Sequence, residues 1–541
     1  MGKLKFHKKM KRLLPDILLI IVIFIGAFII RFYNIKMLPV NHDEANWARI
    51  LLIWPELIKE IIGIPIIFFI PYSLRFFLIS RISSPEVFTL NNFMIHCRFE
   101  PIIIGAGTVV LLYILAKCMY GRKTALISSL LLCFLPWHLI HSRIMGRVIW
   151  VPFFGCLIFL SLFKAFKAIE NKEKIGIGLW FILSCFFMQK SLVSYESAAL
   201  FAPIFFISLI WAKKDARYLL NSKITVILLL IAGLFSLPFI YKSMIRGDEF
   251  GQSFYRAYQE NIFKGNLFAN IWVNIKNNTL FTFKELFFNF KSSSLLYGKA
   301  LKAPLLAHPI AFFLLFTSCI TSFFQRKTAD KILLTWLILG LIGVLGGVNF
   351  FQPRYALIIL PPIIILIAKF IAQIFNYGLQ KQGFTKAFIL IITGTFCFSL
   401  IITEAVQWTK FCYAAPLDLG QCRHNSYGCQ EAGEYLSQLD NIKDYVIIQD
   451  SRMTTDFYLN YYLWEKGKID KYYDFRLVQG EKEQKKRIYV LWAPESHSQD
   501  YWGDLFIYKY VSFKKEYSHK VPIKTIYYPN GLEAIQIFII E

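Results

Sequence analysis

The chain has 541 residues, of which 56% are hydrophobic and 18% charged, and its formal net charge is +25. Its mean hydropathy is too high for a soluble globular protein of this length, and apolar stretches of bilayer length recur along the first three quarters. The sequence also lacks the alternating apolar and polar residues of an outer-membrane barrel. These features predict a polytopic α-helical membrane protein.

The apolar stretches predict about 11 membrane spans, the first of them an uncleaved span behind a basic N-terminus. We place them at approximately 13–33, 99–117, 124–141, 148–167, 175–193, 197–212, 223–242, 305–324, 331–349, 354–373 and 386–406. Basic segments then fall in alternate loops, at 3–12, 117–123, 164–174, 213–223, 326–331 and 369–386. Because basic loops mark the cytoplasmic side, we expect a cytoplasmic N-terminus and an extracytoplasmic C-terminus.

The positive charge is confined to the apolar part of the chain. Residues 1–404 carry an excess of 26 Lys and Arg over Asp and Glu, whereas residues 405–541 sum to −1. The basic excess is therefore a topology signal and does not indicate nucleic-acid binding. We divide the chain into a transmembrane domain, 1–406, and an extracytoplasmic domain, 407–541.

Two of the predicted outer loops are long. The first, 34–97, contains an apolar stretch that Pro65, Pro71 and Arg75 interrupt. A span there would invert every later loop against the charge rule, so we expect short helices lying at the membrane interface. The second, 243–303, mixes aromatic and polar residues and is expected along the same surface.

The C-terminal part has the pattern of a small α/β domain. Residues 430–439 and 455–464 have helical periodicity, while 444–449 and 488–492 read as buried strands. This order predicts some parallel sheet. No Gly-rich phosphate loop precedes a predicted helix, so a nucleotide site is not supported.

Three cysteines, Cys412, Cys422 and Cys429, cluster just after the last span. In an extracytoplasmic domain they could form a disulfide, most simply between Cys422 and Cys429. A metal site that combines these two with His424 is the alternative, although the spacing fits no zinc pattern well.

Charged residues gather at the outer ends of the spans. Asp43 and Glu44 follow His42 in the first loop, and carboxylates so close to a membrane are site candidates. They could accept a proton from a hydroxyl or hold a divalent cation. Basic side chains there could hold a phosphate, or could merely reach the lipid headgroups. The other candidates on this face are Arg98, Glu100, Arg143, Arg147, Lys190, Tyr195, Glu196, His308, Arg354 and Tyr355.

The order of these motifs resembles the GT-C glycosyltransferases that use a polyprenyl-phosphate sugar donor. Within them it is most similar to glycosyltransferase family 39 and its relatives, the protein O-mannosyltransferase and lipid A aminoarabinose transferase group. The resemblance extends over about residues 15–375. Its segments are RFYNIKML at 31–38 followed by HDEA at 42–45, Arg98, YGRKTAL at 120–126, PWHLIHSR at 136–143 and RYALIILPP at 354–362.

The resemblance implies roles for several residues. Asp43, beside Glu44, would be the catalytic base or a metal neighbour, and Arg354 with Tyr355 would hold the lipid-linked phosphate. Many relatives carry an acid where this chain has Val148, which weakens a metal site shared by two loops. The phosphate could also be held by basic residues of the neighbouring segments, namely Arg98, Arg143, Arg147 and Lys190.

The sequence thus predicts a membrane hexosyl- or pentosyltransferase in a bacterial or archaeal cell membrane. It would transfer a sugar from a polyprenyl-phosphate donor to a protein, glycolipid or cell-envelope glycan outside the cytoplasm. Asp43 and Glu44 could bind a divalent cation, Mg or Mn. The alternatives are a lipid or sugar transporter or flippase, and a sensor. The sequence lacks the matched pair of Gly/Pro-broken spans that an inverted-repeat transporter should have.

Overall fold

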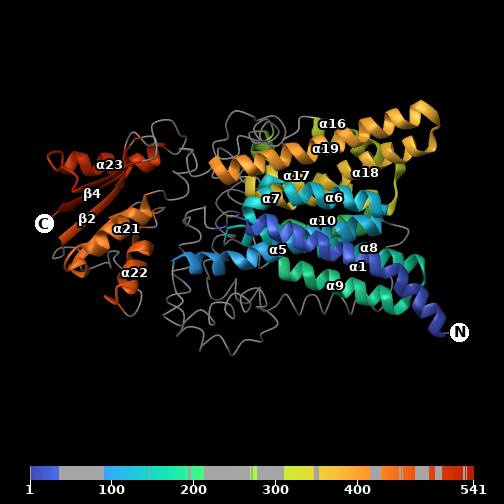
Figure 1. Cartoon of the computed structure of the whole chain (residues 1–541), viewed down its shortest axis with the longest axis horizontal. Coiled ribbons are helices and arrows are strands. Elements are labelled where there is room, and N and C mark those ends of the chain that lie inside the picture. Colours follow the sequence, from blue (N-terminus) through green and yellow to red (C-terminus); the bar gives the residue numbers. More distant parts are fainter. Residues whose placement is uncertain are drawn as a thin grey trace. The chain divides into compact units, whose positions relative to one another are not determined.

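The structure is a computed structural model of the chain (Figure 1). It describes residues 2–33, 35, 90–144, 147–192, 196–211, 269, 272–276, 279, 310–346, 353–414, 428–449, 453, 455–469, 486–493, 503–527, 531 and 533–540. These residues belong to two compact units. The first, here called the membrane unit, comprises the described residues of Met1–Tyr33, Pro101–Lys291 and Lys302–Thr409. The second unit comprises those of Asn34–Glu100, Ser292–Leu301 and Lys410–Glu541.

The membrane unit is built from helices. They are α1 (Gly2–Phe32), α5 (Leu90–Tyr120), α6 (Arg122–Phe134), α7 (Pro136–His141), α8 (Trp150–Glu170), α9 (Lys174–Leu192), α10 (Phe201–Trp211), α16 (Ile310–Gln325), α17 (Thr328–Gly346), α18 (Leu360–Gln380) and α19 (Gly383–Ala414). Three short 3₁₀ helices, η4 (Arg147–Ile149), η5 (Glu196–Leu200) and η7 (Pro353–Ile358), interrupt the series. The division between the units falls within α5 and within α19.

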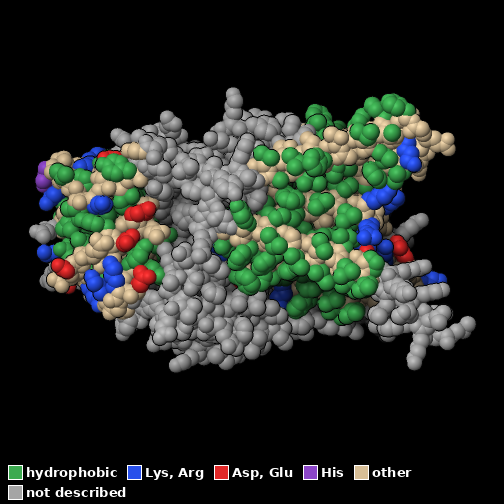
Figure 2. All heavy atoms as spheres, in the orientation of Figure 1, with side chains coloured by type: hydrophobic (Ala, Val, Ile, Leu, Met, Phe, Trp, Pro, Cys, Tyr) green, Lys and Arg blue, Asp and Glu red, His purple; other side chains and the backbone are tan. Residues whose placement is uncertain are grey.

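Six of these helices are long and apolar enough to cross a membrane: α1, α5, α8, α17, α18 and α19. A helix lies at each predicted span position except 223–242, which is outside the described residues. The prediction of a helical integral membrane protein is confirmed, whereas the count of 11 spans stays a prediction. Figure 2 shows apolar side chains over much of the visible face of the helices. The exposed apolar residues of α19 include Phe384, Ile391 and Phe398.

The described basic loops come together at one end of the membrane unit, here called the basic end. The Lys117 ammonium lies 2.7 Å from the Asp16 carboxylate, and Lys167 donates to the Cys118 carbonyl at 3.1 Å. Lys123 donates to the Asn376 side chain at 2.7 Å. Figure 2 shows Lys and Arg side chains gathered there. The positive-inside rule predicts that this end faces the cytoplasm.

Proline corrects the predicted bounds of two spans. The span expected at 124–141 is two helices, because Pro136 lacks an N–H and instead occupies the first turn of α7. The span expected from 354 begins at Leu360, since Pro361 and Pro362 are compatible only with the first turn of α18. Arg354 and Tyr355 therefore lie in η7, ahead of the long helix.

The described C-terminal residues form a four-stranded sheet with the order β1-β2-β4-β3. The strands are β1 (Tyr445–Gln449), β2 (Lys486–Trp492), β3 (Lys524–Tyr527) and β4 (Glu533–Ile540), and the helices are α21 (Cys429–Gln438), α22 (Thr455–Glu465) and α23 (Gly503–Glu516). Strands β1 and β2 are parallel, and the other pairs are antiparallel. The two predicted helices and two predicted strands correspond to α21, α22, β1 and β2, whereas α23, β3 and β4 were not predicted. Cys429 is buried, but Cys412 and Cys422 lie outside the described residues, so the disulfide stays a prediction.

Candidate functional site

Four short helices meet at the end of the membrane unit opposite the basic end, here called the far end. Helix η7 contacts α7, η4 and η5, and α7 also contacts η4. Each adjoins or contains a residue that the sequence singles out. Arg143 follows α7, Arg147 opens η4, Glu196 opens η5, and Arg354 lies in η7. The fold therefore brings together backbone segments that are far apart in the sequence.

Helix α17 holds two of these segments in place. The buried Trp336 indole donates to the Ile358 carbonyl of η7 at 2.8 Å, and its ring stacks on Phe159 of α8. Gly343 lies so close to η5 that a Cβ there would be 2.4 Å from a Leu200 methyl carbon. A tightly packed core of this kind restricts how the short helices can move.

Two buried arginines lie where α1 ends. The Arg31 guanidinium is fully buried and donates to the Ala27 carbonyl at 2.9 Å and to Nδ1 of His138 at 2.8 Å. Because a guanidinium can only donate, Nδ1 of His138 accepts, and the proton of the neutral ring is on Nε2. Arg143, also buried, donates to the Tyr33 carbonyl at 2.8 Å.

The structure also places four more of the predicted site residues: Lys190, Tyr355, Arg98 and Glu100. Lys190 is buried in the last turn of α9, which contacts η5, and its ammonium lies 5.6 Å from the Phe186 ring centre. Tyr355 is half-buried in η7. In the second unit, Arg98 and Glu100 are buried on α5, and Arg98 donates to the Ile35 carbonyl at 2.7 Å.

Other candidates lie outside the described residues and stay predictions: His42, Asp43, Glu44, Tyr195 and His308. Of Arg147, Glu196 and Arg354 the structure describes the backbone alone. Within the described part of the chain, no three His, Cys, Asp or Glu side chains are grouped as metal ligands. Val148, at the position where the resemblance to GT-C enzymes would place an acid, is apolar and buried. This position therefore supplies no acidic metal ligand.

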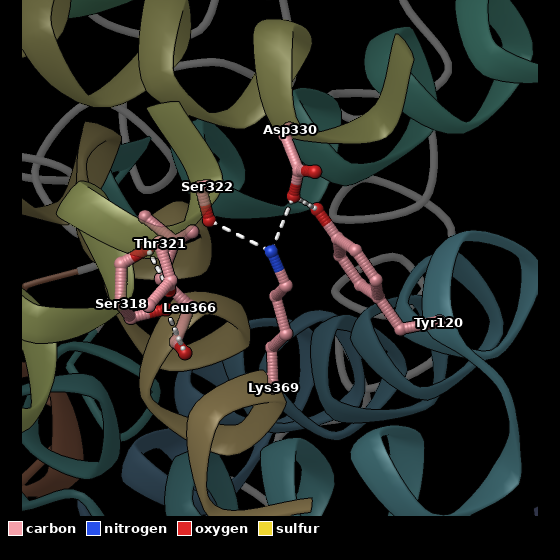
Figure 3. Close-up of polar contacts among 7 residues, drawn as sticks. All are labelled: Tyr120, Ser318, Thr321, Ser322, Asp330, Leu366 and Lys369. Atoms are coloured by element: carbon pink, nitrogen blue, oxygen red, sulfur yellow. Dashed lines mark hydrogen bonds and ion pairs between the residues drawn. The ribbon is translucent and has the colours of Figure 1, made fainter. Parts of the chain in front are cut away.

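The structure also contains a buried ionic cluster at the basic end that the sequence analysis missed (Figure 3). The Lys369 ammonium of α18 donates to Oδ1 of Asp330 at 2.6 Å and to Ser322 at 2.9 Å. The Tyr120 hydroxyl donates to the same Asp330 oxygen at 2.7 Å. Asp330, Ser322 and Lys369 are all buried. Lys369 falls where the predicted span 354–373 overlaps the predicted basic loop 369–386, and its burial within α18 shows that the loop placement is wrong.

A signal for this cluster was present in the sequence. Lys369 interrupts an otherwise apolar run of bilayer length, and a charged residue inside such a run needs a partner. The cluster joins α5, α16, α17 and α18 at the basic end, so it does not belong to the candidate site at the far end.

Comparison with known proteins defines the fold. No protein-family profile matches the chain, and no curated protein matches it in sequence. ArnT from Cupriavidus metallidurans, solved bound to undecaprenyl phosphate, is similar in structure with a TM-score of 0.52 and 10% identity. The match covers 96% of this chain and 97% of that one. The ArnT structure in the apo state gives a TM-score of 0.51 with 11% identity, and that match also covers 96% of this chain and 97% of ArnT.

The archaeal oligosaccharyltransferase AglB from Archaeoglobus fulgidus, in complex with an inhibitory peptide and a dolichol-phosphate, gives a TM-score of 0.49 with 14% identity. The match covers 85% of this chain but only 60% of AglB, so the chain spans well under two thirds of that protein's length. The likeness to ArnT shows that this chain has the same fold, as the resemblance to GT-C enzymes predicts.

Proposed function

We propose that the protein is a membrane glycosyltransferase that moves a sugar from a polyprenyl-phosphate donor to an extracytoplasmic acceptor. The observation that carries this proposal is the meeting of η4, η5 and η7 with α7 at the far end, since Arg143, Arg147, Glu196 and Arg354 belong to these segments. The ArnT fold supports it, because one ArnT structure holds undecaprenyl phosphate.

In the proposed reaction Asp43 takes the proton of an acceptor hydroxyl. The hydroxyl oxygen then forms a bond to the anomeric carbon, while the bond from that carbon to the phosphate oxygen breaks with inversion. The phosphate leaves with the bonding electrons. Arg354, with Arg147 and Lys190, stabilises the negative charge that develops on it. Asp43 follows Tyr33 by ten residues, and Tyr33 lies at the far end in contact with Arg143.

No step is assigned to a metal. Asp43 and Glu44 could bind Mg²⁺ or Mn²⁺ by themselves, but η4 supplies the buried Val148 in place of a second acidic ligand. The C-terminal domain, which we expect outside the cytoplasm, would bind the acceptor or cover the site. Its deletion should therefore change acceptor choice.

A flippase or transporter is the second candidate, and the buried Lys369–Asp330 pair is the observation that favours it. Ionisable residues inside membrane segments often serve ion or substrate pathways. A flippase would move an undecaprenyl-phosphate sugar across a bilayer without breaking the bond between sugar and phosphate.

One assay separates the two candidates. Purified protein in liposomes is given undecaprenyl phosphate linked to labelled mannose or to labelled 4-amino-4-deoxyarabinose, and free undecaprenyl phosphate is measured. The transferase releases it when an acceptor extract is present, and Asp43→Asn lowers the rate by about 100- to 10,000-fold. Asp16→Asn, the same change at the basic end, is the matched control and should keep the rate. Near-normal transfer by a well-folded Asp43→Asn protein removes Asp43 as the base.

A binding titration tests the phosphate site. Arg354→Ala should weaken the binding of undecaprenyl phosphate, since an arginine–phosphate contact is a strong charge-assisted interaction. Arg122→Ala, which removes an exposed arginine at the basic end, is the control. Equal affinity of the Arg354→Ala and native proteins would move the phosphate site elsewhere.

A further inference from the structure

Three lysines at the basic end have no acidic partner among the described residues. Lys123 lies in the first turn of α6, Lys381 directly follows α18, and Lys386 lies in the first turn of α19. All three are at least partly exposed, and none of their ammonium groups forms an ion pair within the described part of the chain. These three residues are here called the lysine surface.

Other cations at the same end do have acidic neighbours. The Lys117 ammonium is 2.7 Å from the Asp16 carboxylate, and the charge of Arg122 also acts on Asp16. Lys369 is bonded to Asp330. Acidic side chains therefore compensate part of the positive charge at this end, but not that of the lysine surface.

Neutral groups hold two of these lysines in place. Lys123 donates to Oδ1 of Asn376 at 2.7 Å, and its ammonium lies 4.8 Å from the Phe375 ring centre. The Lys381 ammonium lies 4.5 Å from the Tyr377 ring centre. An amide oxygen and a ring face orient an ammonium group without cancelling its charge, and an ammonium group has three donors. Both lysines are thus positioned and keep donors for a ligand.

Helix packing brings the lysine surface together. Helix α6 packs against α18, and α19 follows α18 after a tight turn in which Gly383 has a φ of 56°. A Cβ at Gly378 would lie 2.6 Å from a methyl carbon of Ile389, so the start of α19 lies directly against the end of α18. The three lysines therefore extend from neighbouring helix ends.

Exposed aromatic side chains accompany these lysines. They are Tyr377 at the end of α18 and Phe384 and Phe388 at the start of α19, and the two phenylalanine rings stack with their centres 6.0 Å apart. Figure 2 shows basic side chains next to apolar ones at this end. Membrane proteins place aromatic rings at the level of the lipid headgroups. A ligand with both a phosphate and acyl chains would therefore match this part of the molecule.

We propose that the lysine surface binds the headgroup of an anionic phospholipid. The phosphate oxygens accept from the three ammonium groups, and the acyl chains lie against Tyr377, Phe384 and Phe388. Basic sites between membrane helices bind cardiolipin in this way, and its two phosphates complement several cations better than a single phosphate does. The site lies at the opposite end from the candidate functional site, and it does not depend on the proposed function.

Positive charge near a membrane also has a general effect, which is a diffuse attraction of anionic lipid. Diffuse attraction depends on net charge, so any two lysines of the basic end should contribute equally to it. A defined site depends on which lysines are present. Lys381→Gln with Lys386→Gln is therefore the test variant. Lys172→Gln with Lys327→Gln, which removes two exposed lysines from other turns of the same end, is the matched control.

The experiment titrates the full-length protein in neutral detergent at physiological salt. Native mass spectrometry measures the binding of cardiolipin, with phosphatidylcholine as the zwitterionic comparison. The native protein should bind cardiolipin about 10-fold more tightly or better, since each basic residue near an anionic lipid strengthens binding by roughly fivefold. For the same reason the test variant should lose about 10-fold or more in cardiolipin affinity, and the control variant less than about threefold.

Several outcomes would overturn the proposal. Equal losses in the test and control variants would mean diffuse attraction, and native affinity in the test variant would place the lipid elsewhere. Inorganic phosphate that binds as tightly as cardiolipin would remove the lipid as the partner. A native protein without a preference for cardiolipin over phosphatidylcholine overturns the proposal without any variant.

A single substitution keeps the test decisive if the double variant does not fold. Lys386→Gln changes one exposed side chain and should still weaken cardiolipin binding by roughly fivefold relative to Lys172→Gln. Equal affinity of these two single variants would overturn the proposal. The measurement requires no enzymatic activity, so a failure of the proposed transferase function leaves the lipid site to be decided by binding alone.

Discussion

The two ends of the membrane unit bury positive charge in different ways. At the basic end, the Lys369 ammonium is bonded to the Asp330 carboxylate, so charge is neutralised by charge. At the far end, the Arg31 guanidinium is bonded to a main-chain carbonyl and a neutral imidazole, and it also interacts with the Cys133 side chain. Dipoles compensate a buried cation without cancelling its charge.

The two ends also differ in how the chain turns. At the basic end, consecutive helices are joined by tight turns in which one residue adopts a left-handed backbone: Gly121, Lys172, Arg326 and Gly383, with φ of 93°, 59°, 51° and 56°. At the far end the chain passes through 3₁₀ helices instead. Rigid turns at one end and irregular segments at the other match the usual division between scaffold and site.

The largest effect is expected from breaking the Lys369–Asp330 pair. Lys369→Met leaves a buried carboxylate uncompensated and should cost about 3–5 kcal/mol of unfolding free energy. Lys369→Met combined with Asp330→Asn removes both charges and should recover most of that loss. Thermal unfolding in detergent compares the single and double variants, and a double variant as unstable as the single would show that packing, not charge, dominates here.

The double variant Lys369→Met, Asp330→Asn also tests whether the ionic cluster influences the candidate site at the far end. Because the cluster lies at the basic end, transfer per folded molecule should equal that of the native protein. A large loss of turnover in a stable double variant would mean that the two ends are coupled, and it would favour the transporter.

A medium effect is expected at Tyr120, whose hydroxyl donates to Asp330. Tyr120→Phe removes one hydrogen bond to a charged acceptor, worth about 1.5–3 kcal/mol. The ring would keep its place 5.1 Å from the Lys369 ammonium. Tyr113 offers a matched control on the same helix, because its buried hydroxyl has no partner among the described residues. Tyr113→Phe should be neutral or stabilising, and equal losses in both variants would contradict the assignment.

The sequence predicts the scaffold better than the site. Long apolar runs reveal the spans, and alternate basic loops reveal that they share one end, because both signals are local. The short helices at the far end have no such signal. Their place depends on Trp336 and Gly343 of α17, which contact η7 and η5 from far along the chain. Arg143 is predicted as a candidate phosphate ligand at the outer face, but its burial and its bond to the Tyr33 carbonyl could not be read from residue types.

The ionic cluster at the basic end likewise shows that a sequence does not identify the partner of a buried charge. Asp330 and Lys369 are 39 positions apart. Asp330 resembles an ordinary loop charge beside basic neighbours, whereas Lys369 in its apolar run signals that a partner is needed without identifying it. Only the packing of α16, α17 and α18 makes them partners. Charge patterns along a sequence therefore predict the end at which a residue lies, but not its partner.

The smallest effect is expected in the turns of the basic end. Arg326 is held at φ 51°, a left-handed conformation that costs an L-residue about 1–2 kcal/mol and glycine almost nothing. Arg326→Gly should therefore raise the unfolding free energy, by up to about 1 kcal/mol, once the greater freedom of glycine in the unfolded chain is counted. Gly383→Ala, at φ 56° in the turn between α18 and α19, is the reciprocal change and should lower it by about 1 kcal/mol. Thermal unfolding of both variants gives the two changes in unfolding free energy. Shifts of the same sign in the two would mean that these turns do not constrain the helices, and that the scaffold is held by its helix contacts and by the ionic cluster alone.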